Sequence, residues 1–209
     1  MPSLPKLYAI LDIDSLTARG LEPRAVLDVW LTAGIRLVQL RAKTASSGEM
    51  LRLAEPLAEA CRQAGATFVI NDRADIARLA GADGVHVGQS DLSPSAVRVI
   101  CPPPSLIGLS THDDATARAG CDTTADYLAI GPVFTTATKA DADPAVGVDG
   151  VQRVSAIVAR SRPLVAIGGI TLANAASVWA AGADSVAVVS DLLVGDLPQR
   201  ARAWVAISQ

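Results

Sequence analysis

The chain has 209 residues, of which 50% are hydrophobic and 19% are charged. This composition is typical of a folded globular domain and too poor in charge for a disordered chain. With 18 basic and 21 acidic residues, the formal net charge is −3, which argues against a broad surface for nucleic acid or an anionic membrane. We expect residues 1–209 to form a single domain, with an aliphatic core because aromatic residues make up only 3% of the chain.

The cysteines and the N-terminal segment indicate a soluble cytoplasmic protein. The three cysteines have no CxxC spacing and are expected to be reduced thiols rather than disulfide partners or zinc ligands; they are Cys61, Cys101 and Cys121. The first apolar run is brief and soon meets Asp12 and Asp14, unlike a signal peptide. The longest uncharged stretch, 163–183, contains Gly168-Gly169 and is better explained as a strand, a turn and a helix than as a membrane span.

Short apolar runs recur along the chain, and each ends in a small polar or charged residue or in glycine or proline. They cover residues 7–12, 37–41, 67–71, 84–88, 106–111, 127–132, 164–169 and 185–190. Continuous apolar strands of this kind are buried on both faces, as in a parallel sheet covered by helices.

Alanine-rich amphipathic segments alternate with these runs, and several close with a glycine that suits a helix C-cap. They cover residues 23–34, 47–65, 92–100, 113–120, 151–160 and 171–182. The alternation predicts an α/β fold, a (β/α)8 TIM barrel with a parallel eight-stranded barrel. An open doubly wound sheet is the alternative; it would not usually reach eight parallel strands, and no GxGxxG motif follows the first strand.

One connection is longer than the others. It runs from the end of the sixth predicted strand, at residue 132, into the seventh, and the excess lies at 133–150. A long irregular segment inside a compact domain is usually functional, often as a lid.

Polar residues gather where the strands end, which in a TIM barrel is where the active site lies. Gln39, Arg41 and Lys43 alternate along one strand, so their side chains point the same way while the chain stays extended. Lys139 can join them from the long loop. Converging cations predict an anionic ligand; the alternative is that these side chains are simply solvated.

Asp72 and Asp91 follow two neighbouring predicted strands. Two carboxylates about 4 Å apart repel by on the order of 4 kcal/mol at an effective dielectric near 20, and Mg²⁺ is usually held by one or two carboxylates together with ligand oxygens and water. The alternative is that each aspartate only caps the helix that follows it. Together with the cations, the pair predicts a magnesium-bound diphosphate.

A second anion site is predicted after the last two strands. Gly168-Gly169 allows close approach of a phosphate to the backbone, and Ser190 adds a hydroxyl. The chain has no Walker A or HExxH motif, and no convincing Ser-His-Asp set. His86 lies within an apolar run and is expected to be packed or hydrogen-bonded. The site therefore favours charge stabilisation over covalent chemistry.

Several motifs at the predicted strand ends resemble one enzyme family. They are QLRAK at 39–43, IND at 70–72, HVGQSD at 86–91, GLSTH at 108–112, GPVFTTATK at 131–139, AIGGI at 166–170 and VVS at 188–190. In this order, and over nearly the whole chain, they resemble thiamine phosphate synthase. The resemblance implies a TIM-barrel transferase that joins 4-amino-2-methyl-5-(diphosphooxymethyl)pyrimidine to thiazole phosphate, or to its carboxylate precursor, and releases diphosphate and thiamine phosphate in thiamine diphosphate biosynthesis.

The resemblance also implies a role for each matching residue. The pyrimidine diphosphate would be bound by Gln39, Leu40, Arg41, Ala42, Lys43, Asn71, Ser110 and Lys139. The catalytic groups among them would be Arg41, Lys43, Ser110 and Lys139. Mg²⁺, the expected cofactor, would be held by Asp72 and Asp91. The thiazole phosphate would be bound by Thr136, Ala137, Thr138, Gly169, Val189 and Ser190. Small-molecule substrates are the expected partners, with no nucleic acid or membrane and with homo-oligomerisation left open.

The chain departs from the family pattern at two positions: Ala42 stands where Glu is common, and Thr135 where Pro is common. Ala42 has the opposite parity to Arg41 and Lys43, so its side chain is expected to point away from the diphosphate.

Two other functions are alternatives. A thiazole tautomerase would have little use for a complete diphosphate site, and a non-catalytic phosphate-binding barrel would not require both aspartates and all three cations.

Overall fold

The computed structural model describes residues 4–136, 144–159 and 161–209. Its eight strands form a closed parallel barrel in chain order, because β1 pairs with both β2 and β8. The strands are β1 (Leu7–Asp12), β2 (Leu37–Arg41), β3 (Thr67–Asn71), β4 (Gly84–Val87), β5 (Leu106–Thr111), β6 (Tyr127–Ile130), β7 (Leu164–Ile167) and β8 (Ser185–Val188). The predicted TIM barrel is confirmed, and the open-sheet alternative is wrong.

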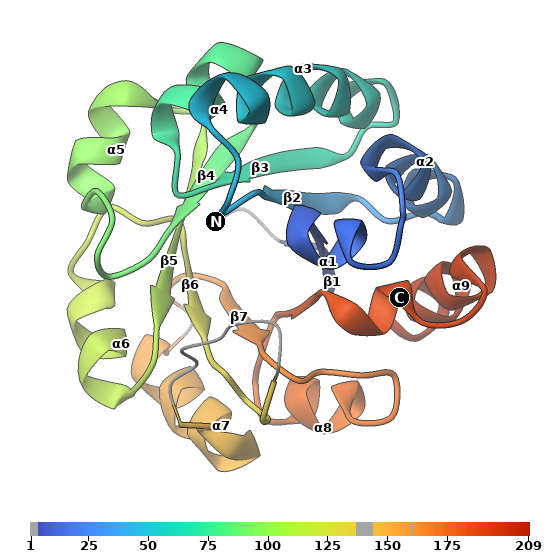
Figure 1. Cartoon of the computed structure of the whole chain (residues 1–209). Helices are drawn as coiled ribbons and strands as arrows, with labels where there is room; N and C mark the ends of the chain where they lie inside the picture. The colour runs from blue at the N-terminus through green and yellow to red at the C-terminus, as the bar shows by residue number, and fades with distance from the viewer. Residues whose placement is uncertain (1–3, 137–143, 160) are drawn as a thin grey trace.

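The helices surround the strands and follow one another around the barrel (Figure 1). They are α1 (Ile13–Thr17), α2 (Pro23–Ala33), α3 (Ser47–Gln63), α4 (Ala74–Ala80), α5 (Pro94–Ile100), α6 (Asp114–Cys121), α7 (Gly147–Val158), α8 (Ala175–Ala180), the 3-10 helix η1 (Ser190–Leu193) and α9 (Leu197–Ile207). Among these described segments, none is both long and apolar enough to cross a bilayer.

Local sequence signals account for many of the helix boundaries. Ser46 and Glu49 form a reciprocal capping box at the start of α3. Gly34 ends α2 in the left-handed conformation, with φ at 107°, which glycine adopts without steric cost. The start of α7 was predicted at Val151, but the helix begins at Gly147. It therefore takes up part of the segment that the sequence indicated as loop.

The core forms two layers, because successive strand side chains point alternately outward and inward. The outer layer, between barrel and helices, is mainly aliphatic, as predicted. The inner layer fills the barrel itself and includes Tyr8 and Tyr127, the only tyrosines of the chain. The other six buried residues of this layer are aliphatic, as expected, but both tyrosine rings are also almost completely buried.

Three aspartates secure the amino-terminal end of the barrel. Asp83, Asp126 and Asp184 each stand directly before an even-numbered strand. Each carboxylate accepts a hydrogen bond from a backbone N–H at the start of the preceding strand, and each backbone N–H donates to the carbonyl of that same residue. The pairs are Asp83 with Phe68, Asp126 with Ile107 and Asp184 with Leu164. This repeated contact fixes how neighbouring strands begin, at the end opposite the predicted site.

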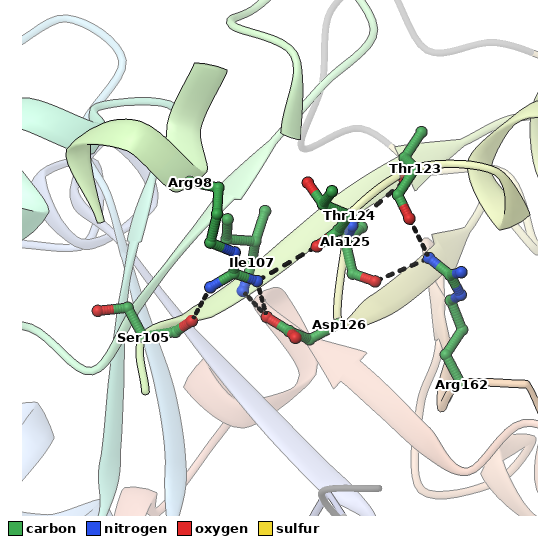
Figure 2. A network of polar contacts seen from close by, with 8 residues as sticks. All are labelled: Arg98, Ser105, Ile107, Thr123, Thr124, Ala125, Asp126 and Arg162. Atoms are coloured by element: carbon green, nitrogen blue, oxygen red, sulfur yellow. Dashed lines mark hydrogen bonds and ion pairs between the residues drawn. The ribbon is translucent and has the colours of Figure 1, made fainter. Parts of the chain in front are cut away.

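Two arginines extend this arrangement beside β5, β6 and β7 (Figure 2). Arg98 donates to Asp126 Oδ2 at 2.6 Å and to the carbonyl of Ser105 at 2.6 Å. Arg162 donates to backbone carbonyls around the end of α6, which are those of Gly120, Cys121, Thr123 and Ala125. Because partly buried carbonyls need donors, the two guanidinium groups stabilise the turn that leads into β6.

Candidate active site

The carboxyl ends of the strands surround a cavity of about 400 Å³. Apolar side chains from inside the barrel, including Ile10, Val165 and Ala187, line its floor, and polar groups line its rim. Many residues selected from the sequence line it together; they are Gln39, Arg41, Lys43, Asn71, Asp72, Asp91, Ser110, Thr136, Gly169, Val189 and Ser190. The barrel thus brings residues that are far apart in the sequence to one place.

Some of the predicted site residues are placed elsewhere. Leu40 and Ala42 are buried in the outer layer of the core, so Ala42 points away from the cavity, as its parity predicted. Ala137, Thr138 and Lys139, together with the middle of the long loop, lie outside the described residues. The side chain of Val189 packs on the inner layer of the core.

Arg41 reaches the cavity from the end of β2 with a counterion already beside it. Its Nη1 atom lies 2.5 Å from Oδ2 of Asp12, which is only 2% exposed. The other oxygen of Asp12 accepts the N–H of Ser15 at 2.8 Å and so caps α1. Sequence reasoning did not assign Asp12 to the site. The pairing of neighbouring strands could have indicated it, because Asp12 and Arg41 are the last residues of β1 and β2 and lie opposite each other.

Asp72 and Asp91 meet on the rim, close to Lys43. Lys43 Nζ lies 2.5 Å from Asp72 Oδ2. Burial raises the pKa of Asp72, the Lys43 ammonium lowers it, and the neighbouring Asp91 carboxyl raises it again. A half-buried carboxyl whose ionisation is opposed by burial and by a neighbouring carboxyl is a setting that a divalent cation relieves.

Neither aspartate serves as a helix cap, so the capping alternative is wrong. The N-cap of α4 is Arg73, and Ser93 caps α5. Asp91 instead accepts the N–H of Gly88 at 2.8 Å. Asp72 has a φ of 62°, a left-handed conformation that is uncommon for a non-glycine residue, and strain of this kind is often found at functional sites.

The donor set of this acidic pair fits Mg²⁺ better than a softer metal. Both groups are carboxylates, which hard cations prefer. Within the described residues, no cluster of three or more His, Cys, Asp or Glu side chains is arranged to hold a metal ion. A cation at Asp72 and Asp91 would therefore depend on oxygens from a ligand and from water.

A chain of hydrogen bonds runs through the barrel interior to the cavity. Gln39 Nε2 donates to the Tyr8 hydroxyl at 2.8 Å, and the two tyrosine hydroxyls lie 3.1 Å apart. Tyr127 Oη lies 3.0 Å from His86 Nδ1, and His86 Nε2 lies 2.8 Å from Ser110 Oγ. His86 is therefore packed and hydrogen-bonded, as predicted. Burial lowers its pKa to about 4, so the ring is neutral near pH 7.

Three glycines give the site its shape. A side chain at Gly108 would collide with His86 and Tyr127, whose rings are stacked with centroids 5.5 Å apart. Gly168 and Gly169 have φ values of 103° and 64°. A Cβ atom on either would collide with the segment that follows β6. The sequence predicted that these two glycines admit a phosphate; in the structure they admit the chain's own segment after β6.

Comparison with known proteins agrees with this geometry. A family model described as thiamine monophosphate synthase matches residues 7–192. The chain belongs to this family. The thiamine-phosphate synthase of Koribacter versatilis is 46% identical over 209 residues, covering 98% of this chain and 96% of that protein. The thiamine-phosphate synthase of Chloroflexus aurantiacus is 40% identical over 208 residues, covering 98% and 94%.

A solved structure shows the same relationship. The thiamine phosphate pyrophosphorylase from Pyrococcus furiosus superposes with a TM-score of 0.86 at 30% identity, over 97% of this chain and 95% of that one. The family is one of transferase enzymes, so the resemblance read from the strand-end motifs is confirmed. The tautomerase and the non-catalytic barrel are not favoured.

Proposed function

We propose that this protein joins 4-amino-2-methyl-5-(diphosphooxymethyl)pyrimidine to thiazole phosphate with the help of Mg²⁺, giving thiamine phosphate and diphosphate. One observation carries the proposal: two cations and two acids, Arg41, Lys43, Asp72 and Asp91, converge on a single cavity. The cations suit the oxygens of a diphosphate, and the acids suit a divalent ion that accompanies it.

The role of each residue follows from its place in the cavity. Arg41 and Lys43 bind the diphosphate, Ser110 donates a hydrogen bond to it, and Gln39 and Asn71 orient the pyrimidine ester. Mg²⁺, held by Asp72 and Asp91, would neutralise charge on the diphosphate and so ease its departure. The apolar floor accepts the pyrimidine ring. On the opposite side of the cavity, the thiazole phosphate is bound by Thr136, Gly169 and Ser190, with Val189 beside them.

The chemistry that fits these groups is a dissociative substitution. The bond between the pyrimidine methylene carbon and the diphosphate oxygen breaks, and the electron pair leaves with the diphosphate. The electron-rich aminopyrimidine carries the positive charge until the thiazole nitrogen donates its electron pair to the methylene carbon. The residues named here act by preorganised charge and hydrogen bonding, and none of them forms a covalent intermediate.

The test is a reaction with pure components. The protein is incubated with both substrates and Mg²⁺, and thiamine phosphate and diphosphate are measured. We expect the two products in equal amounts, and none when Mg²⁺ is chelated. Interconversion of thiazole isomers without coupling would identify a tautomerase, and binding of both substrates without turnover would identify a ligand-binding barrel; either result contradicts the proposal.

A further inference from the structure

The buried hydrogen-bond chain of Gln39, Tyr8, Tyr127, His86 and Ser110 is continuous from the barrel interior to the cavity. Tyr8 and Tyr127 are 1% and 2% exposed, and the charge chemistry proposed above has no use for either hydroxyl. A phenol proton buried this deeply is held in place, since burial raises the pKa of both tyrosines. The chain therefore consists of neutral groups at ordinary pH.

Such a chain can run in only two directions. Each hydroxyl has one proton to donate, and a neutral imidazole has one donor nitrogen and one acceptor nitrogen. The direction of one link therefore sets the direction of all the others. If two neighbouring hydrogen bonds ran in opposite directions, one pair of groups in the chain would have two protons between them, or none.

The two directions present different surfaces to the cavity. When Gln39 Nε2 donates to Tyr8, Tyr8 donates to Tyr127 and Tyr127 donates to His86 Nδ1. His86 then carries its proton on Nε2 and donates it to Ser110 Oγ, so the Ser110 proton is left for a ligand. In the reverse direction, Ser110 donates its proton to His86 and offers the cavity only lone pairs.

Resting on the proposed function, we propose that Gln39, Tyr8, Tyr127 and His86 act as positioning residues that keep Ser110 a hydrogen-bond donor toward the leaving diphosphate. With the Gln39 amide oriented so that Nε2 donates to the Tyr8 hydroxyl, the chain runs in this direction. A diphosphate offers only acceptor oxygens to a hydroxyl, so the reverse direction would place two acceptors against each other. Charge on the diphosphate grows as its bond to carbon breaks, so a fixed donor helps the transition state more than the ground state.

Gly108 supports the same interpretation. A Cβ atom there would collide with both His86 and Tyr127, so glycine at this strand position allows these two neighbouring members of the chain to stack. His112, the second histidine of the chain, contacts the Gly131 carbonyl through Nδ1 at 2.9 Å. It is not a member of the buried chain.

The first test is the tautomer of His86, which does not depend on activity. The chain has two histidines, so nitrogen NMR of the ¹⁵N-histidine-labelled protein at neutral pH resolves them, and His86→Gln assigns the signals. We expect the proton on Nε2 of His86 and an unprotonated Nδ1. A proton on Nδ1 would overturn the proposal, even if the protein proves to be an active thiamine phosphate synthase.

The second test is a double-mutant cycle on kcat. Tyr127→Phe keeps the ring and removes the proton that His86 Nδ1 accepts. We expect kcat to fall about tenfold in the wild-type background, with KM for the pyrimidine diphosphate changed less than about threefold. In a Ser110→Ala background the same change should cost little, because the chain acts through Ser110. Equal losses in both backgrounds, or no loss in the wild type, would overturn the proposal.

Thr111→Val is the matched control. Thr111 stands next to Ser110, and its buried hydroxyl donates to the carbonyl of Ala129 at 3.0 Å outside the cavity lining. Its loss should leave kcat unchanged. Thermal unfolding of each variant shows whether it is folded. If Tyr127→Phe does not fold, Tyr8→Phe interrupts the same chain one link earlier and takes its place in the cycle. Absence of any product from the wild-type protein would instead contradict the proposed function.

Discussion

At the scale of single residues, charge partners decide what each site residue can do. Arg41 is paired with the buried Asp12, whereas Lys43 contacts Asp72 at the rim. Part of the positive charge inferred from the sequence is therefore already balanced inside the protein. In the proposed mechanism, a divalent cation held by Asp72 would take the place of Lys43 there and leave the Lys43 ammonium to bind the diphosphate.

Asp91→Ala should abolish magnesium-dependent release of diphosphate, lowering turnover at least about 100-fold. The reason is that a single carboxylate is left to hold the ion beside Lys43. Diphosphate release is measured at several Mg²⁺ concentrations, with Asp28→Ala, an exposed change on α2, as the control. Unchanged turnover in Asp91→Ala would contradict the metal assignment.

Asp12→Asn should weaken binding of the pyrimidine diphosphate. Asn keeps the size of the side chain and can still cap α1, but it no longer fixes the Arg41 guanidinium by charge. We expect KM to rise about fivefold to tenfold in steady-state assays. Asp14→Asn, two residues further on at an exposed position, is the matched control. Equal KM values for the two variants would show that Asp12 does not position Arg41.

At this scale the sequence predicted many of the side chains that line the cavity, but not the residues that support them. Parity placed Gln39, Arg41 and Lys43 together, and strand ends placed Asp72 beside Asp91. Asp12 was not found because a charge at the end of a strand is also an ordinary stop signal. The link from Tyr8 to Tyr127 depends on inward-facing side chains of strands far apart in the sequence, which spacing alone does not reveal.

At the scale of elements, continuous apolar runs made the strands easy to predict, since both faces of each strand are buried. Boundaries set by local turns were harder. The sequence predicted an irregular segment over 133–150, yet its last residues, from Gly147, belong to α7. The last helix, α9, was not predicted. It is held to the barrel by Arg200 and Trp204, which both donate to Asp191.

Asp126→Ala should destabilise the protein without changing catalysis. The change leaves the Ile107 N–H without its carboxylate acceptor and the partly buried Arg98 without its ion pair, a loss of about 1–3 kcal/mol. Urea denaturation measures the free energy of unfolding, with Asp122→Ala at the exposed end of α6 as the control. Asp126 lies at the end of the barrel opposite the cavity. A lower kcat, measured where the variant is fully folded, would therefore contradict the prediction that Asp126 acts on stability alone.

At the scale of the whole molecule, barrel closure is what creates the site. The two cations, Arg41 and Lys43, and the two acids, Asp72 and Asp91, come from separate segments of the chain. The cavity takes lining groups from every strand or from the turn that follows it. One end of the barrel fixes strand positions through the aspartates that stand before β4, β6 and β8, and the other end carries the polar rim. The same division is general in TIM barrels.

Diphosphate and Mg²⁺ together should stabilise the folded protein. A ligand at about 100 times its Kd adds about 2.7 kcal/mol to the free energy of unfolding, which for a chain of this length raises Tm by roughly 5–10 °C. Differential scanning fluorimetry should show this shift with both components and much less with either alone. A full shift that persists in Asp91→Ala would place the ligand elsewhere.

The most direct test of the central claim is a crystal structure of the protein with Mg²⁺ and the pyrimidine diphosphate, prepared without the thiazole so that no turnover occurs. We predict the diphosphate between Arg41 and Lys43, with the magnesium ion bound by Asp72 and Asp91. A diphosphate bound outside this cavity, or a metal ion bound away from both aspartates, would contradict the account.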